Sequence, residues 1–216
     1  MITAAITAEK FFELEREIIE SGMGSDKDSF EVIRERLISP PIMTPEEFAR
    51  EAVYVILAGG FRQVVAKRKY SEIVPRLYDG VTADEVFAMF HNPNKAKAIA
   101  MHWNERARFC SGFYARPTAE RRIAYLSTLP HIGQITAHHL ARNLGISVVK
   151  YDVWIQRLGI MDAGLSDTAA AFPLEPRVQA ACDAMFGRLE AQTGLPRGYI
   201  DVVLWKACQI KLIELS

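Results

Sequence analysis

The sequence predicts an all-α protein. Apolar residues recur at three- and four-residue spacing through nearly every segment of the 216-residue chain, which is typical of helices with one buried face. We find no strand-like alternation of apolar and polar residues, no internal repeat and no low-complexity segment. Half of the residues are hydrophobic and 24% are charged, an ordinary composition for a globular protein that buries a core.

Polar start signals define several of the expected helices. A threonine followed two or three residues later by an acid, the pattern of an N-cap and first helical turn, stands at Thr7, Thr44, Thr82 and Thr118. The helices expected in chain order run from Thr7 to about Gly22, from Asp28 to Leu37, from Thr44 to Gly59, over residues 61–69 and 70–77, from Thr82, from Lys95 to about Cys110, from Thr118 to a turn at Leu129, from Gly133, from Asp152, from Val178 to Leu189 and from Gly198 to about Leu215.

Charge is distributed unevenly along a chain whose net charge is zero. Residues 1–51 hold 6 basic and 12 acidic residues, whereas residues 91–159 hold 10 basic residues against 3 acidic ones. A basic middle between acidic ends fits a surface that binds a polyanion such as nucleic acid, although solvated helix faces can also differ by chance.

The sequence gives no support for a metal centre, an iron–sulfur cluster or a membrane anchor. Cys110, Cys182 and Cys208 are far apart and form no C-x-x-C pair, which favours a reducing, cytoplasmic compartment. His138 and His139 are adjacent and so cannot form the i, i+4 pair of a helical metal site. The N-terminal residues lack the pattern expected of a signal peptide, and the sequence contains no run of 18 apolar residues.

The turn LPHIG, residues 129–133, joins two expected helices in the basic stretch. Pro130 ends the first helix, and Gly133 permits the close backbone approach that a tight reversal requires. Because a second helix starts at once, its free N–H groups and positive dipole end form a phosphate site that reads backbone and not sequence. An ordinary αα-corner with a Pro/Gly turn is the alternative interpretation.

Two segments carry a resemblance to a known family. LPHIGQITA resembles the L-P-G-V-G-x-x-T-A hairpin of the helix-hairpin-helix (HhH-GPD) DNA glycosylases, and KYDVWIQRLG resembles their V-D-x-x-[IV]-x-R segment. Gly133 and Asp152 lie 19 residues apart, close to the spacing in endonuclease III-like members. VILAGGFRQVVAKR and FHNPNKAKAIAMHWNERA resemble the family's lesion-facing loop and asparagine-bearing loop, so the resemblance spans about residues 45–160.

The resemblance implies a fold of two helical lobes with a DNA-binding cleft between them. One six-helix lobe would comprise residues 43–146 and carry the hairpin at about 119–145. The second lobe would combine residues 1–42 with 147–216 and carry the catalytic acid. The partner would be double-stranded DNA containing a lesion or mismatch, with the target nucleotide flipped out of the helix and the enzyme acting as a monomer. The location would be cytoplasmic, and nucleoid-associated in a prokaryote.

The resemblance assigns catalysis to Asp152. Breaking an N-glycosidic bond develops positive charge on the deoxyribose. A nearby carboxylate stabilises this charge or orients the attacking water. Asp152 is also a plausible N-cap, and the two roles are compatible. Strand-cleaving members have a nucleophilic lysine two positions after the second hairpin glycine, where this chain has Ile135. We therefore expect a monofunctional glycosylase, with Lys150 as the alternative nucleophile or a phosphate contact.

The remaining site residues follow from the same resemblance. The residues expected to contact DNA are Pro130, His131, Ile132, Gly133, Thr136, Lys95, Arg62 and Arg157. The residues expected to line the base pocket or fill the gap left by the flipped base are Tyr151, Trp154, Phe61 and His91. No cofactor is expected, apart from a possible monovalent cation at the hairpin.

The leading hypothesis is a base-excision-repair DNA glycosylase. Two alternatives remain: a bifunctional glycosylase and lyase that uses Lys150, and a DNA-binding module that kept this fold without catalysis. A small-molecule enzyme has no motif in its favour. The excised base is open among alkylated purines, oxidised purines and mismatched uracil or thymine, because pocket shape decides among them.

Overall fold

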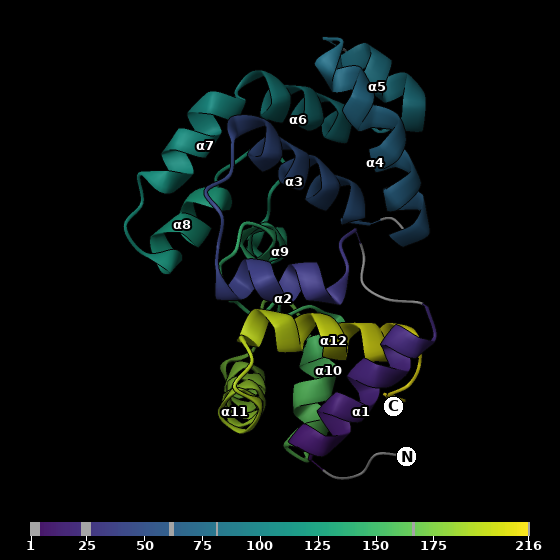
Figure 1. Ribbon diagram of the computed structural model, residues 1–216, viewed down its shortest axis with the longest axis vertical. Helices are drawn as coiled ribbons and strands as arrows, with labels where there is room; N and C mark the ends of the chain where they lie inside the picture. Colours follow the sequence, from purple (N-terminus) through teal and green to yellow (C-terminus); the bar gives the residue numbers. More distant parts are fainter. Residues whose placement is uncertain (1–4, 23–26, 61–62, 81, 166, 216) are drawn as a thin grey trace. The chain divides into compact units, whose positions relative to one another are not determined.

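A computed structural model describes residues 5–22, 27–60, 63–80, 82–165 and 167–215. These residues form twelve α-helices and no strand, so the predicted all-α class is confirmed (Figure 1). Contacts between Cα atoms divide the chain into two compact units: unit 1, residues 1–38 with 147–216, and unit 2, residues 39–146. The first boundary lies at 38/39 and not at the expected 42/43. No helix within the described ranges is long and apolar enough to cross a membrane.

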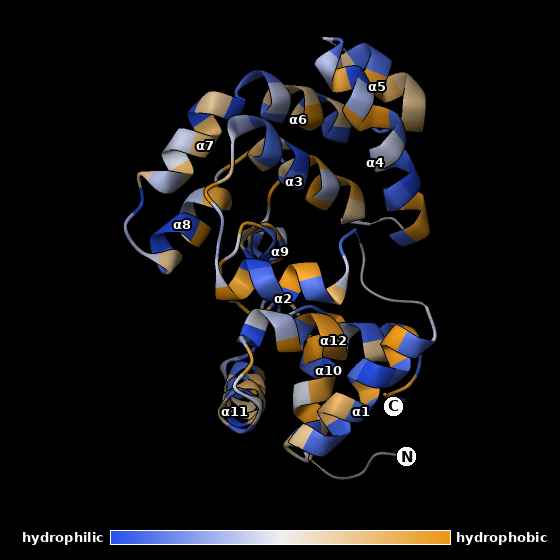
Figure 2. Cartoon of the chain, viewed as in Figure 1, coloured by the Kyte–Doolittle hydropathy of each residue, from blue (hydrophilic) through white to orange (hydrophobic). Residues whose placement is uncertain are grey.

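Unit 1 surrounds one apolar core. Its described helices are α1 (Ala8–Glu20), α2 (Phe30–Ile38), α10 (Val153–Asp162), α11 (Pro176–Thr193) and α12 (Arg197–Gln209). α10 packs against α11 and α12, while α1 and α2 pack on α12. Figure 2 shows both apolar and polar residues on α1, whose Phe11, Leu14 and Ile18 are fully buried. Thr7 caps this helix as predicted, since its side chain accepts a hydrogen bond from Lys10 N.

A glycine brings α10 close to α11. A Cβ added at Gly159 would lie 2.4 Å from Cys182 Sγ and 3.1 Å from the backbone N and Cα of the same residue. No side chain larger than hydrogen fits at that contact without moving one helix away from the other. The position of α10, which begins next to Asp152, therefore depends on this packing.

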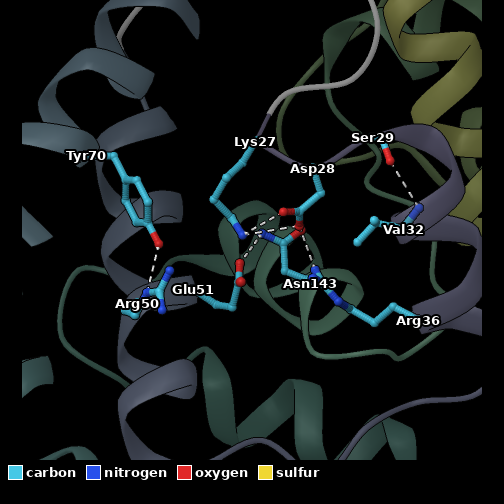
Figure 3. Close-up of polar contacts among 9 residues, drawn as sticks. All are labelled: Lys27, Asp28, Ser29, Val32, Arg36, Arg50, Glu51, Tyr70 and Asn143. Atoms are coloured by element: carbon cyan, nitrogen blue, oxygen red, sulfur yellow. Dashed lines mark hydrogen bonds and ion pairs between the residues drawn. The ribbon is translucent and has the colours of Figure 1, made fainter.

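Unit 2 is organised around α3 (Pro45–Ala58). The other helices within its described residues are α4 (Gln63–Tyr78), α5 (Ala83–Phe90), α6 (Pro93–Asn104), α7 (Arg106–Tyr114), α8 (Ala119–Leu126) and α9 (Gln134–Asn143). α3 packs against α4, α6, α7 and α9, and it begins with a capping box between Thr44 and Glu47. Side chains also link these helices: Asn143 Nδ2 donates to Glu51 Oε2 at 3.1 Å, and Arg50 Nε donates to Tyr70 Oη at 3.3 Å (Figure 3).

The single helix expected from Lys95 to Cys110 is wrong. The chain leaves helical geometry at Glu105, with φ −97° and ψ 15°, which separates α6 from α7. The side chain of Arg106 donates to the backbone carbonyl of Trp103 at 2.8 Å, which satisfies one of the last carbonyls of α6. After the turn, α7 buries Phe109, Cys110 and Phe113. The described part of unit 2 accordingly contains seven helices, and not the six expected for its lobe.

Two other helix bounds also differ from expectation. The two helices expected over residues 61–69 and 70–77 form one described helix, α4, which buries Ala66, Ile73 and Leu77 along one face. The last helix ends at Gln209 and not near Leu215, because Lys211 adopts a left-handed φ of 63°. The N–H of Leu212 then donates to the carbonyl of Ala207 at 2.9 Å and closes the helix end.

Candidate functional site

The LPHIG hairpin connects α8 to α9 through a compact turn. Leu129 and Ile132 are buried, while His131 and Gly133 are exposed. The N–H of Ile132 donates to the carbonyl of Leu129 at 3.1 Å. The turn therefore anchors two apolar side chains inside unit 2 and presents its backbone at the surface.

The conformational requirement of this turn falls on His131 and not on Gly133. His131 adopts a left-handed φ of 60°, whereas Gly133 has φ −86° and ψ 179°, which any residue adopts. A Cβ added at Gly133 would meet only Thr136 Oγ1, at 3.9 Å. The expectation that Gly133 is needed for the reversal is therefore wrong. The strained position is the one where the resembling motif has its first glycine and this chain has histidine.

His102 supports the hairpin from inside unit 2, a role that nothing in the sequence signalled. Its side chain is fully buried, and Nε2 lies 3.0 Å from the carbonyl oxygen of Pro130. Burial lowers the pKa of His102 to about 4, so the ring is neutral at pH 7 and Nε2–H donates to that carbonyl. Nδ1 of the same ring is buried and has no hydrogen-bond partner among the described residues.

The N-terminus of α9 is open to solvent. Its N-cap is Gly133, so no side-chain oxygen accepts from the first N–H groups of the helix. The hydroxyl of Thr136 donates to the carbonyl of Gly133 at 2.9 Å, which leaves those N–H groups unused by that side chain. Uncapped N–H groups and the positive end of the helix dipole suit a phosphate oxygen.

Lys95 does not fit the surface phosphate contact expected of it. Its side chain is buried, and its Nζ donates to the carbonyl of Gly59 at the end of α3. Burial lowers the pKa of the Lys95 amine. Burial also lowers the pKa of His131, and the positive charge of Lys95 adds to that effect. Lys95 is thus an internal cation near the hairpin, and its burial prevents direct contact with a DNA backbone.

The loop residues expected at the DNA surface are only partly described. Arg62 and Phe61 lie outside the described residues. His91 is exposed at the C-cap of α5 with a left-handed φ of 55°, and its ring stacks edge-on against Phe87 at 5.6 Å. Arg157 is exposed on α10 and lines a cavity of about 450 Å³ within unit 1, together with Ile160, Met161, Gly164, Leu165, Thr168, Ala169, Ala170 and Leu215.

Asp152 is the N-cap of α10, as one of its two predicted roles required. Its Oδ1 accepts hydrogen bonds from the N–H groups of Trp154 at 3.0 Å and Ile155 at 3.3 Å. The other oxygen, Oδ2, lies 3.0 Å from Nζ of Lys150. The helix therefore holds the carboxylate through one oxygen, and the lysine contacts the second.

The aromatic residues expected to form a base pocket are engaged with unit 1. Tyr151 donates its hydroxyl to the carboxylate of Asp183, and its ring packs with that of Trp154 against the core. Burial and the bond to Asp183 raise the pKa of the Tyr151 hydroxyl. The ring of Trp205 on α12 lies beside the ion-pair partner of Asp152: Lys150 Nζ is 5.5 Å from its centre. Nothing in the local sequence links Trp205 to residues 150–152, so the sequence did not predict this contact.

The three cysteines are free and buried. Burial raises the pKa of the Cys208 thiol to about 12, and the negative charge of Asp152 adds to this effect, so that thiol is protonated at pH 7. Across the described ranges, no group of three or more His, Cys, Asp and Glu side chains has the arrangement of a metal site.

The fold is that of DNA glycosylases. No family model and no curated protein sequence matches the chain. Among solved structures, it is similar to the 8-oxoguanine DNA glycosylase of Methanocaldococcus jannaschii, with a TM-score of 0.68 and 16% identity over 96% of this chain and 94% of that one. The same archaeal glycosylase/lyase in complex with a 15mer DNA containing 8-oxoguanine gives a TM-score of 0.64 at 16% identity, over 96% and 99%. The 8-oxoguanine DNA glycosylase of Thermotoga maritima gives 0.63 at 18%, over 92% and 96%.

Proposed function

We propose that this protein is a base-excision DNA glycosylase that hydrolyses the N-glycosidic bond of a damaged or mismatched base in double-stranded DNA. The observation that carries the proposal is the carboxylate of Asp152, fixed at the start of α10 in a chain with a glycosylase fold. Such an enzyme acts in the compartment that holds the DNA, the cytoplasm in a prokaryote.

The fixed carboxylate suits the charge that develops in this reaction. As the bond from sugar to base breaks, the deoxyribose gains positive charge, and a preorganised anion next to it lowers the barrier. The N–H groups of Trp154 and Ile155 hold Asp152 by Oδ1, so the carboxylate does not need to reorient during the reaction. Electrostatic groups of this kind are typically worth about 10²–10³-fold in rate.

The hairpin supplies the grip on DNA in this proposal. The uncapped start of α9 offers backbone N–H groups to a phosphate, and the exposed His131 and Gly133 leave room for the strand to approach. A monovalent cation held by the hairpin carbonyls is a second way to bind the same phosphate. Ile135 occupies the position of the family's lysine nucleophile, so base release uses water and the first product is an abasic site.

The substrate base is tested with a panel of lesions. The three similar structures are 8-oxoguanine glycosylases, which makes 8-oxoguanine the first base to test, followed by alkylated purines and mismatched uracil or thymine. Each duplex is incubated with excess protein in single turnover, and alkali then reveals abasic sites as strand breaks. We expect base release from one lesion class.

The Asp152→Asn variant tests the catalytic assignment. Asparagine is also a good N-cap, so α10 stays in place while the negative charge is lost. We expect base release to slow by about 10²–10³-fold with DNA affinity retained. Asp167→Asn is the matched control, since it removes an equal charge from an exposed carboxylate that pairs with Arg177 at 3.3 Å. Undiminished base release by Asp152→Asn would refute the assignment, and DNA binding without base release by any form would favour the binding-module alternative.

A further inference from the structure

A primary amine lies on the carboxylate to which we assign catalysis. Lys150 Nζ is 3.0 Å from Asp152 Oδ2, and the two side chains are only 18% and 15% exposed. No carboxylate other than Asp152 forms an ion pair with Lys150 among the described residues. The pair is therefore shielded from bulk water yet still reachable at its surface.

The backbone and one aromatic ring hold the amine in this place. The N–H of Asp152 donates to the carbonyl of Lys150 at 2.6 Å, a three-residue turn that brings residues 150 and 152 together. On α12, the ring of Trp205 lies 5.5 Å from Lys150 Nζ and offers the cation a second favourable contact. Local turn geometry and a tertiary contact thus both direct this flexible side chain to Asp152.

The two carboxylate oxygens of Asp152 have different hydrogen-bond partners. Oδ1 accepts two hydrogen bonds from the N-terminus of α10, which leaves Oδ2 as the oxygen that no backbone N–H group of that helix start occupies. Oδ2 is the oxygen that contacts Lys150 Nζ. Because the two groups are 3.0 Å apart, a sugar that contacts Oδ2 also lies next to the amine.

We propose that Lys150 is an amine nucleophile that cleaves the DNA strand at an abasic site, which gives this protein a lyase activity in addition to base release. The proposal rests on the proposed function for the supply of abasic sites. Lys150 would serve as the amine nucleophile in place of a hairpin lysine, because this chain has Ile135 at the hairpin position.

The reaction balances with water as the one further reactant. Lys150 passes a proton to Asp152, and its neutral nitrogen adds to the aldehyde carbon C1′ of the opened sugar. Asp152 returns the proton to the departing hydroxyl, water leaves and a C=N bond forms. Loss of a proton from C2′ to Asp152 then expels the 3′-phosphate with the electron pair of the C3′–O bond. Water hydrolyses the imine, which frees Lys150 and an unsaturated aldehyde, and no oxidant or reductant is consumed.

The experiment uses the full chain and a duplex that already contains an abasic site, so its result does not depend on base release. Sodium borohydride reduces an imine to a stable amine and traps a protein–DNA adduct. We expect wild type to form the adduct and Lys150→Arg to lose it, since a guanidinium keeps the ion pair with Asp152 but is not a nucleophile. Lys10→Arg is the matched control, because Lys10 also pairs with a carboxylate, Glu13 at 2.9 Å, and should form the adduct normally.

Peptide mapping of the wild-type adduct provides a second measurement that does not depend on how a variant folds. A modified Lys150 supports the proposal. An adduct at the N-terminal amine or another lysine overturns it, as does an adduct that persists in Lys150→Arg or its absence from wild type. Adduct formation without base release from any lesion would refute the glycosylase and leave the lyase, whereas base release without an adduct would do the reverse.

Discussion

The two helices that begin at the proposed functional residues begin in opposite ways. α9 starts at Gly133 with no side-chain cap, so its first N–H groups face outward. α10 starts at Asp152, whose carboxylate accepts from the N–H groups of Trp154 and Ile155. The same feature, the positive end of a helix, thus suits an external anion in unit 2 and fixes an internal one in unit 1.

The two helix starts also differ in what holds them. A hydrogen bond from fully buried His102 to the carbonyl of Pro130 supports the hairpin before α9. Close packing of Gly159 against Cys182 fixes α10. The hairpin therefore depends on a titratable group, whereas the position of Asp152, the proposed catalytic acid, depends on the close packing of two helices.

The largest expected effect is the pH dependence of stability that arises from His102, which holds the hairpin by a hydrogen bond. The pKa of His102 falls from its ordinary value of 6.5 to about 4 in the folded protein, because burial disfavours the charged ring. Between these values the unfolded chain binds the proton and the folded chain does not. The stability from this group is complete above pH 6.5 and is lost as pH falls toward 4, by about 1.4 kcal/mol per pH unit and about 3 kcal/mol in total.

Denaturant unfolding at pH 4 to 7 measures this loss, with His102→Gln as the comparison. Glutamine cannot titrate, but its amide can still donate to Pro130. The difference in the free energy of unfolding between the two proteins should therefore change with pH over that range. A difference that stays constant from pH 7 to 4 would show that His102 does not carry the dependence.

Gly159→Ala should disturb the other helix start. The added methyl would overlap Cys182 Sγ and its backbone, which forces α10 away from α11 and costs about 1–3 kcal/mol in the free energy of unfolding. Gly187→Ala in α11 is the control, since its Cβ would meet only the end of the Arg197 side chain at 3.4 Å. Chemical denaturation measures both variants, and equal stabilities would contradict the packing argument.

Gly133→Asp would make the start of α9 resemble that of α10. The carboxylate would cap the open N–H groups and repel phosphate, so affinity for undamaged duplex should fall about tenfold at low salt. Gly133→Asn caps the same groups without charge, and we expect a smaller loss. If Gly133→Asp binds DNA as well as wild type, the start of α9 is not a phosphate site.

The smallest expected effect lies at the tip of the hairpin. His131 adopts φ 60°, where a side chain costs about 1 kcal/mol that glycine avoids. His131→Gly should therefore be more stable than His131→Ala by about 1 kcal/mol in thermal unfolding, while wild type lies close to the alanine variant. Equal stability of the glycine and alanine variants would argue against strain at this turn.

The sequence was sufficient where the signal is local. The caps at Thr7, Thr44, Thr82 and Thr118 appear as predicted, because each depends on residues within one turn. The N-cap role of Asp152 followed in the same way. The break at Glu105 was missed, since it accompanies a side-chain contact from Arg106 and the burial of α7, neither of which has a sequence pattern.

The surroundings of individual side chains could not be predicted from the sequence. A lysine on a helix usually lies in solvent, but Lys95 is buried against the carbonyl of Gly59, 36 residues earlier in the chain. His102 and Trp205 act through partners 28 and 55 residues away, Pro130 and Lys150. In contrast, the spacing of Lys150 and Asp152 allowed their contact, and the turn between them determined that it forms.

The short turn from Lys150 to Asp152 places the amine and the carboxylate on one continuous segment of the chain. A nucleophile at Ile135 would belong to unit 2 and its acid to unit 1, so any hinge motion between the units would change the distance between them. The pair found here is spanned by three consecutive residues of unit 1, so the distance between its amine and its carboxylate does not depend on motion between the units.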